Sequence, residues 1–390
     1  MKPNIKFADR VERLTGSISR EILSVSKSGN TISFAGGLPD DDFLEGMALP
    51  RASELSYQYG ASEGDCELRK LFADRIRGLG REVSWKETLV LSGSQQGLDL
   101  ISKLFLMKGR TVIVESPTYL AALQVFRFFE AKVVGVPLDD EGIDLSLLQK
   151  AIETEDIAFV YINPTYQNPS GANYSEVRRR KLAELLNESG TLLIEDDPYR
   201  ELSFEKVQKN IPVVSRLNTN WIYLNSVSKI LVPGLRIGCL ACSENLFDSF
   251  LKVKQTADLH TSRVSQSIVF QMLQSQYEMD RHLSQLIGVY RAKRDEMARS
   301  LAKRMSVYAD WKLPEGGMFF WLKLRGNRSS KRLMKSCLKR NVAILSGDAF
   351  FAEVANNSRW LRLNFTNPKL EEIDLGIQVL SEEVLVNSAV

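Results

Sequence analysis

The chain has little of what marks several common classes of protein. Its 390 residues include four cysteines and two histidines, and the formal net charge at pH 7 is +3. So few cysteines exclude a disulfide-stabilised scaffold, and so small a charge gives no footprint for nucleic acid or an anionic membrane. The N-terminal residues lack the apolar core of a secretion signal, and no apolar run approaches the ~20 residues of a membrane span. We therefore expect a globular protein of the reducing cytoplasm.

The scarcity of histidine also bears on a possible metal site. Cys239 and Cys242 form a CxxC pair, a spacing found in many zinc sites, but His260 and His282 are the only imidazoles in the sequence. A structural zinc ion needs about four ligands. Because unpaired cysteines are often buried, we interpret the pair as small core residues of a strand and expect no metal.

What the sequence does contain is an alternation of short apolar segments with helical patterns. The segments that read as strands are continuously apolar, which is typical of a sheet covered by helices on both faces. Such a sheet is mainly parallel and binds its ligand at the carboxyl ends of the strands. These segments span residues 87–91, 111–115, 132–136, 157–162, 191–194 and 221–224.

The length of the chain suits two closely packed domains. We expect an α/β fold with a large ligand-binding domain over residues 46–285, in which a mainly parallel, mixed sheet lies between helices. A smaller α+β domain follows over residues 286–390. Residues 1–45 form an arm and part of the small domain, with a helical pattern over 17–23.

Polar residues follow several of the predicted strands, at the edge where a ligand is expected. The Gly/Ser turn over 92–97 joins a strand to a helix, and free N–H groups and the helix dipole attract an anion there. A Pro/Asn/Gly-rich loop over 163–171 follows another strand, and Asp196 and Asp197 follow a third. Many such turns bind nothing, and acidic residues also cap helices, so these features alone leave the ligand open.

The stretch over residues 225–238 carries the clearest chemistry. Lys229 follows Ser226 and Ser228 at the end of an apolar strand, and Arg236 comes after a Pro-Gly turn. A desolvated lysine loses its proton more readily, and a neutral amine forms a Schiff base with an aldehyde. Hydroxyl groups and an arginine suit a phosphate. Together they suggest pyridoxal 5'-phosphate (PLP), although a surface turn explains the stretch alone about as well.

Arg362 is a candidate for binding a substrate carboxylate. The alternating segment over 359–365 places it on one face with Trp360 and Asn364. An arginine among aromatic residues near a domain junction can anchor a carboxylate, and a solvated edge position is the usual alternative. Gly36 and Gly37 allow a backbone to turn sharply or to come close to a ligand.

Several motifs occur together in one order along the chain: SFAGGLP over 33–39, QYG over 58–60, SGSQQ over 92–96, EDDPY over 195–199, and the stretch over 226–236. Through them nearly the whole chain resembles the class I/II aminotransferases of PLP fold type I. Within these it is most similar to the kynurenine/2-aminoadipate aminotransferase branch. The resemblance implies PLP as cofactor, an amino acid and a 2-oxo acid as substrates, a ping-pong reaction, and a homodimer.

The resemblance also implies roles for single residues. Lys229 would hold PLP as a Schiff base and carry the substrate proton, while Asp196 would keep the pyridine nitrogen protonated. Asn168 and Tyr199 would bind the phenolic oxygen, and Tyr119 would stack on the ring. The phosphate would be held by Ser94, Gln95, Ser226, Ser228, Arg236 and, from the neighbouring subunit, Tyr59.

The remaining implied roles concern the substrate. Arg362 would fork onto the α-carboxylate, where Gly37 would close over it and Asn168 would contribute. Arg20 falls where relatives keep an arginine that senses the substrate side chain. It would favour glutamate or 2-aminoadipate, or swing away to admit aromatic or branched side chains. A solvated helix arginine is an equally good interpretation.

Two alternatives remain at this stage. A β-lyase or cyclising synthase can use the same fold and cofactor, and spectra with release of ammonia and pyruvate would separate it from a transaminase. Some transcription regulators carry an aminotransferase-like domain. Here the resemblance begins within about 30 residues, which leaves no room for a DNA-binding domain of typically ~50 residues.

Overall fold

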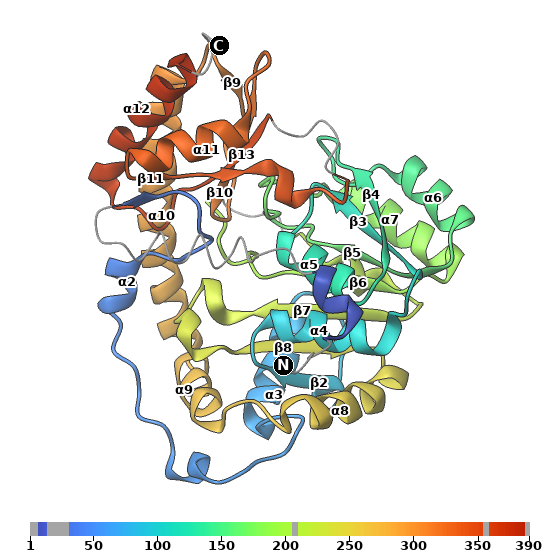
Figure 1. Cartoon of the computed structure of the whole chain (residues 1–390). Helices are drawn as coiled ribbons and strands as arrows, with labels where there is room; N and C mark the ends of the chain where they lie inside the picture. The colour runs from blue at the N-terminus through green and yellow to red at the C-terminus, as the bar shows by residue number, and fades with distance from the viewer. Residues whose placement is uncertain (1–6, 14–30, 205–209, 354–358, 387–390) are drawn as a thin grey trace, which may run out of the picture.

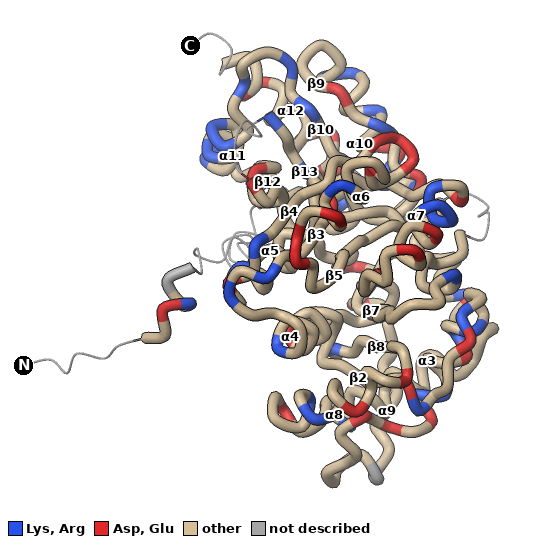
Figure 2. Tube along the Cα trace, turned by 90° about the vertical axis from the view of Figure 1, so that its right-hand side faces the viewer, with Lys and Arg blue, Asp and Glu red and all other residues tan. Residues whose placement is uncertain are grey.

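A computed structural model describes residues 7–13, 31–204, 210–353 and 359–386 of the chain (Figure 1). The helical pattern predicted over 17–23, with Arg20, lies outside these ranges. None of the helices in them is long and apolar enough to cross a membrane. Figure 2 shows Lys and Arg interspersed with Asp and Glu over most elements, with one mainly basic helix, α11.

The central sheet of the described residues has seven strands in the order β2–β8–β7–β6–β5–β3–β4. The strands from β7 to β4 in this order are parallel, and β8 runs antiparallel to both of its neighbours. This confirms the predicted α/β fold with a mainly parallel, mixed sheet. The strand bounds are β2 Thr88–Leu91, β3 Thr111–Ser116, β4 Lys132–Pro137, β5 Ile157–Ile162, β6 Leu193–Asp196, β7 Trp221–Ser226 and β8 Gly238–Cys242.

Helices cover both faces of this sheet because successive strand residues point to opposite sides. In β5, Phe159 packs with α4, α5 and α8, whereas Val160 packs in the other cluster with α3, α6 and α7. Both side chains are fully buried. The helices are α3 Cys66–Gly78, α4 Ser94–Phe105, α5 Leu120–Phe128, α6 Leu145–Thr154, α7 Glu176–Ser189, α8 Glu244–Asp258 and α9 Arg263–Leu273.

The C-terminal part of the described chain contains a second, four-stranded antiparallel sheet in the order β12–β13–β10–β9. The N-terminal strand β1 (Ile32–Ser33) pairs in parallel with β11 (Val342–Ala343), so residues near the chain start join this part. The other elements are α2 Asp41–Glu45, α10 Gln276–Arg304, β9 Ala309–Asp310, β10 Phe319–Leu324, α11 Ser330–Lys339, β12 Leu345–Ser346, β13 Trp360–Asn364 and α12 Leu370–Val386.

The division into domains at residues 45 and 285 stays a prediction. Helix α10 runs continuously across residue 285, and its Lys293 forms a buried ion pair with Asp40 just before α2. Thr366 Oγ1 donates to the carbonyl of Leu38 at 2.8 Å. The segment from Phe34 to Asp40 is thus fastened to the C-terminal part of the chain.

Two predictions about single strands can be compared with the structure. Cys239 and Cys242 are free and buried in β8, as predicted for core residues. The bounds predicted for one strand, 191–194, were wrong by two residues at each end. The observed β6 begins at Leu193 and also includes Glu195 and Asp196. Glu195 pairs with β5 and β7 and Asp196 pairs with β7, and the Oε2 atom of Glu195 accepts a bond from Val214 N. Internal partners therefore allow acidic residues inside a buried strand.

Candidate active site

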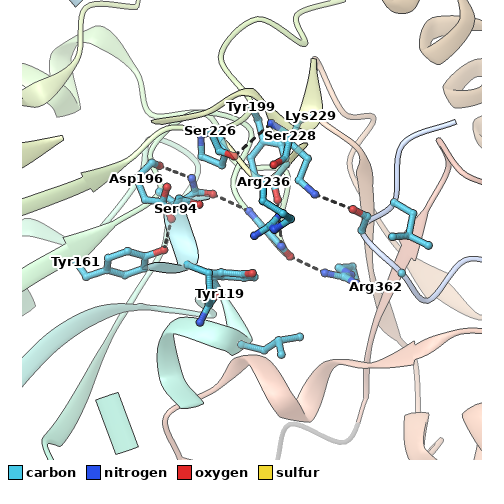
Figure 3. Close-up of a pocket in the computed structure, with 18 residues that line it drawn as sticks. Ser94, Tyr119, Tyr161, Asp196, Tyr199, Ser226, Ser228, Lys229, Arg236 and Arg362 are labelled. Carbon is cyan, nitrogen blue, oxygen red and sulfur yellow. Dashed lines mark hydrogen bonds between the residues drawn. The ribbon is translucent and has the colours of Figure 1, made fainter. Parts of the chain in front are cut away.

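One pocket lies at the carboxyl ends of the parallel strands, between the central sheet and the C-terminal part of the chain (Figure 3). Most of the residues predicted from sequence line it, and they come from distant parts of the chain. They are Gly37, Ser94, Gln95, Tyr119, Asn168, Asp196, Tyr199, Ser226, Ser228, Lys229, Arg236 and Arg362.

Lys229 projects into this pocket from a short 3-10 helix, Val227–Lys229, that directly follows β7. Its Nζ donates a hydrogen bond to the carbonyl oxygen of Gly37 at 2.9 Å. Burial lowers the pKa of this amine to about 8, and the positive charges of Arg236 and Arg362 act in the same direction. The free amine, the form that attacks carbonyl carbon, is therefore more accessible near neutral pH than in an ordinary lysine.

Asp196 ends β6 on the opposite wall of the pocket (Figure 3). Its Oδ2 accepts a bond from the hydroxyl of Tyr161 at 2.8 Å, and its backbone oxygen accepts one from Asn163 Nδ2. Its Oδ1 is buried and has no hydrogen-bond partner among the residues described. Burial raises the pKa of Asp196 to about 7; the bond from Tyr161 opposes this rise and Asp197 adds to it. A cationic N–H group at Oδ1 would restore the ionised carboxylate.

The loop over 163–171 brings Asn168 to the centre of the pocket. Asn168 Nδ2 donates to the hydroxyl of Tyr199 at 3.2 Å, and Asn168 N donates to the side chain of Asn163 at 2.9 Å. Glu115, which is fully buried, fixes the loop by accepting bonds from Asn163 N, Gln167 and Tyr174. Burial raises the pKa of Glu115 to about 7, and these three donors act against the rise.

Arg362 reaches the pocket from β13 and is almost fully buried. Its Nη1 donates to Asn168 Oδ1 at 2.8 Å and its Nη2 to the carbonyl of Ala35 at 2.6 Å. The guanidinium lies over the rings of Phe319 and Phe350, at 4.4 and 5.0 Å. Its Nε has no partner in the described part of the chain, and burial lowers the pKa of Arg362 to about 10. This buried cation therefore has N–H groups free for an anion.

A second cationic site lies at the start of α4. Gly93 precedes the helix with φ +79°, and a Cβ there would lie 2.5 Å from Arg236 Nη2. Only glycine therefore lets the guanidinium rest against this turn. Ser94 and Gln95 form the first turn, and the buried Oγ of Ser228 has no hydrogen-bond partner within the described ranges. Free N–H groups, hydroxyl groups and an arginine together suit a phosphate.

Comparison with known proteins identifies the family to which a chain with this pocket belongs. Residues 44–380 match the family described as aminotransferase class I and II. The chain belongs to this family. It is a PLP-dependent transaminase, as the sequence motifs predicted, and the fold is PLP fold type I.

Two curated aminotransferases illustrate the relationship. An aromatic-amino-acid aminotransferase of Thermococcus litoralis is 34% identical over 97% of this chain and 94% of its own. A 2-aminoadipate transaminase of Thermus thermophilus is 33% identical over 96% and 95%. The solved structure of an α-aminoadipate aminotransferase from Thermus thermophilus, complexed with N-(5'-phosphopyridoxyl)-L-leucine, has a TM-score of 0.88 at 31% identity and covers 98% of both chains. These relatives support transamination and do not favour the lyase or synthase alternative.

The pocket of this aminotransferase fits PLP and an amino acid. Three buried polar atoms without partners in the described chain, Asp196 Oδ1, Ser228 Oγ and Arg362 Nε, belong to residues that line the same cavity. Buried polar atoms normally have partners. The acceptor Asp196 Oδ1 suits a protonated ring nitrogen, the hydroxyl of Ser228 suits a phosphate, and the cationic donor Arg362 Nε suits a carboxylate.

The sequence analysis missed some residues that line the aminotransferase pocket, and two of the residues that it did predict are not among those that line it. Tyr161, Asn163 and Leu120 also line it. Tyr161 read as an ordinary core residue of a strand, although a buried tyrosine hydroxyl requires a partner and thereby signals a nearby polar group. Tyr59, which was predicted to reach the neighbouring subunit's phosphate, is not among the residues that line this pocket, and it is 78% exposed. Arg20 lies outside the described residues.

Proposed function

We propose that this pocket binds PLP at Lys229 and moves an amino group between an L-amino acid and a 2-oxo acid. The observation that carries the proposal is the position of Lys229, whose amine shares one cavity with Asp196, Arg236 and Arg362. When bound, PLP withdraws electrons from the substrate Cα through its protonated ring. The reaction is ping-pong, since the amino group stays with the enzyme between the two substrates.

The protein's own groups orient the cofactor ring and keep its charge. Asp196 would keep the ring nitrogen protonated through its unpaired Oδ1, while Tyr161 donates to the other carboxylate oxygen at 2.8 Å. Asn168 and Tyr199 bind the phenolic oxygen, and their mutual bond at 3.2 Å already directs the two groups to one place. Tyr119, the residue that caps the start of α5, would pack against the ring.

Phosphate binding falls to the residues around the start of α4. Ser94 and Gln95 contribute their backbone and side-chain donors, and Ser226, Ser228 and Arg236 contribute from the segment after β7. The helix N-terminus and Arg236 together balance the charge of a phosphate dianion. These residues would hold the cofactor by its phosphate.

Lys229 also performs proton transfer. Its Nζ would carry the proton between the substrate Cα and the cofactor's C4' carbon, which requires an amine that is neutral near working pH. A pKa of about 8, set by burial and two neighbouring arginines, is suited to this exchange. The carbonyl of Gly37 keeps the amine oriented in the pocket.

Arg362 binds the α-carboxylate of the amino acid. Its Nη1 and Nη2 each hold one protein oxygen, which leaves Nε and the remaining hydrogens for a carboxylate. Asn168 and Gly37 lie beside it and complete this end of the pocket.

For the amino donor we propose 2-aminoadipate, glutamate, or an aromatic or branched-chain amino acid. The names of the relatives and the leucine adduct in the solved neighbour support this range. Leu38 and Leu120 give the pocket apolar contacts for such side chains. We keep Arg20 as the proposed partner of a distal carboxylate.

We further propose a cytoplasmic homodimer in which Tyr59 reaches the phosphate of the neighbouring subunit. In support, the segment between α2 and α3, which contains a short 3-10 helix over Glu54–Tyr57, runs along the edge of the molecule (Figure 1). Tyr57 and Tyr59 on this segment are 74% and 78% exposed. Arg263 donates to the carbonyls of Gln58 and Tyr59, which fixes the direction of the segment.

The test is a set of single half-reactions. The loaded enzyme is mixed with a panel of L-amino acids, and the loss of the cofactor's absorbance band and the gain of its amine form are followed. We expect conversion with at least one of the proposed donors and no release of ammonia and pyruvate. Absence of conversion throughout the panel, or ammonia release in its place, would contradict the proposal.

A further inference from the structure

A fully buried lysine lies directly behind the turn that we assign to phosphate binding. Lys254 is on α8, which packs against α4, and its side chain has no exposed surface. Its Nζ donates to Gln96 Oε1 at 2.9 Å, to Thr261 Oγ1 at 2.9 Å, and to Asp258 Oδ1 at 2.6 Å. The three hydrogens of the ammonium therefore have three acceptors.

These contacts close a ring around the turn. Gln96 Oε1 also accepts a bond from Ser92 N at 2.9 Å, and Gln96 Nε2 donates to Asp258 Oδ2 at 2.6 Å. The side chain of Gln96 is thus bonded at both ends, once to the backbone that enters the turn and twice to the Lys254–Asp258 pair. A glutamine held at both its oxygen and nitrogen has little freedom to change rotamer.

The opposite side of the turn is held by the pocket itself. A Cβ on Gly238 would lie 2.9 Å from Ser94 N, so β8 packs directly against the first residue of α4. Arg236 rests on Gly93 from the same side. The turn therefore lies between Arg236 and β8 on one side and, on the other, a ring of hydrogen bonds around the buried Lys254.

The backbone that carries the ring is strained. Leu259 ends α8 with φ +65° and ψ −60°, and His260 N bonds to the carbonyl of Asp258 at 2.7 Å across it. A tight turn with this sign of φ is rare and costs of order 1–3 kcal/mol. Thr261 Oγ1 bonds to Val90 O at 3.1 Å and Gln266 bonds to Thr261 O at 2.8 Å, which holds the strained turn in place.

We propose that Lys254 is a positioning residue which, through Gln96 and Asp258, holds the turn over 92–96 in the geometry that receives the cofactor's phosphate. The inference rests on the proposed roles of Ser94, Gln95 and Arg236. It assigns Lys254 to cofactor affinity and gives it no part in proton transfer. Removing Lys254 leaves Gln96 Oε1 with one bond and lets the first turn of α4 relax.

The experiment compares PLP with pyridoxal, which lacks the phosphate, in absorbance titrations of the cofactor-free protein. We expect Lys254→Met to weaken PLP binding about 10- to 100-fold, the cost of losing a charged hydrogen bond, and to change pyridoxal binding little. Lys252→Met, an exposed lysine on the same helix, is the matched control and should behave as wild type. Equal losses for both ligands, or no loss for PLP, would overturn the inference.

Two further variants keep the outcomes distinct. Gln96→Ala leaves the Lys254–Asp258 pair intact and should also lower the preference for PLP, which tests the inference if Lys254→Met does not fold. Arg236→Ala tests the proposed phosphate site itself. If Arg236→Ala keeps the preference for PLP, the proposed site is wrong; if it loses the preference while the Lys254 and Gln96 variants keep it, only the inference is wrong.

Discussion

Lys229 and Lys254 are two lysines withdrawn from bulk water in opposite surroundings. Lys229 has a carbonyl oxygen as its partner, and burial together with two arginines lowers its pKa to about 8. Burial also lowers the pKa of Lys254, but there the hydrogen bond and charge of Asp258 oppose the change. Neighbours of like charge thus prepare one amine to react, whereas a carboxylate keeps the other as a charged structural contact.

The difference shows why burial alone does not identify a reactive lysine. The ammonium of Lys254 has three acceptors, so the loss of its proton would leave one of them without a donor and would end the ion pair with Asp258. A neutral Lys229 would still have a hydrogen for the carbonyl of Gly37 and would no longer be repelled by Arg236 and Arg362. The pattern of partners, more than the depth of burial, separates a catalytic lysine from a positioning one.

Replacing Lys229 tests this contrast with the largest effect. We expect Lys229→Ala to lower transamination by about 10,000-fold or more, because both the attachment of PLP and the proton carrier are lost. Borohydride reduction of the loaded variant should leave no cofactor attached to this peptide, measured by mass spectrometry. Lys254→Met is the control and should still be labelled at Lys229. Full activity of Lys229→Ala would reject the assignment.

Replacing Arg362 removes one of the two cations near Lys229 and the proposed carboxylate site. We expect Arg362→Ala to weaken amino-acid binding by about 2–5 kcal/mol, since a buried charge-assisted pair is lost. The dissociation constant from half-reaction rates measures this. Arg359→Ala, an exposed arginine just before the same strand, should bind the amino acid normally. Unchanged affinity in Arg362→Ala would exclude its role.

Removing the hydroxyl of Tyr161 should have a smaller effect, on the charge of Asp196. The bond from Tyr161 favours the ionised carboxylate, so Tyr161→Phe should raise the pKa of Asp196. We expect the acidic limb of the pH profile of kcat/KM to move to higher pH and kcat to fall about tenfold.

Tyr174→Phe is the matched control for this variant. Tyr174 is also a buried tyrosine that donates to a carboxylate, but its partner is Glu115 outside the pocket. It should lose stability without moving the acidic limb. The same pH shift in both variants would indicate a general effect of packing, contrary to a specific contact with Asp196.

Sequence patterns predict the fold of this chain well, because its strands are continuously apolar and its turns carry glycine or serine. They also indicate Lys229, since a lysine after a buried strand is unusual. The same patterns give no sign of Lys254, which reads as one of several charged residues on an amphipathic helix. Its burial depends on Gln96 and Thr261, which are distant in sequence or lie beyond the helix end. The unpaired Asp196 Oδ1 and the role of Tyr161 likewise follow from three-dimensional contacts.

The smallest predicted effect concerns the arginines that lower the pKa of Lys229 and have no counterpart beside Lys254 among the described residues. In the cofactor-free protein, a pKa of about 8 means that the neutral fraction of Lys229 rises as pH increases through 8. Acetylation of Lys229 by a small reagent should follow this curve, measured by peptide mass spectrometry, while Lys254 stays unlabelled because it is buried. Arg362→Gln removes a positive neighbour, so the pKa of Lys229 should rise and labelling at pH 8 should slow by about two- to fivefold. An unchanged or faster rate would mean that the charge of Arg362 does not contribute to the reactivity of Lys229.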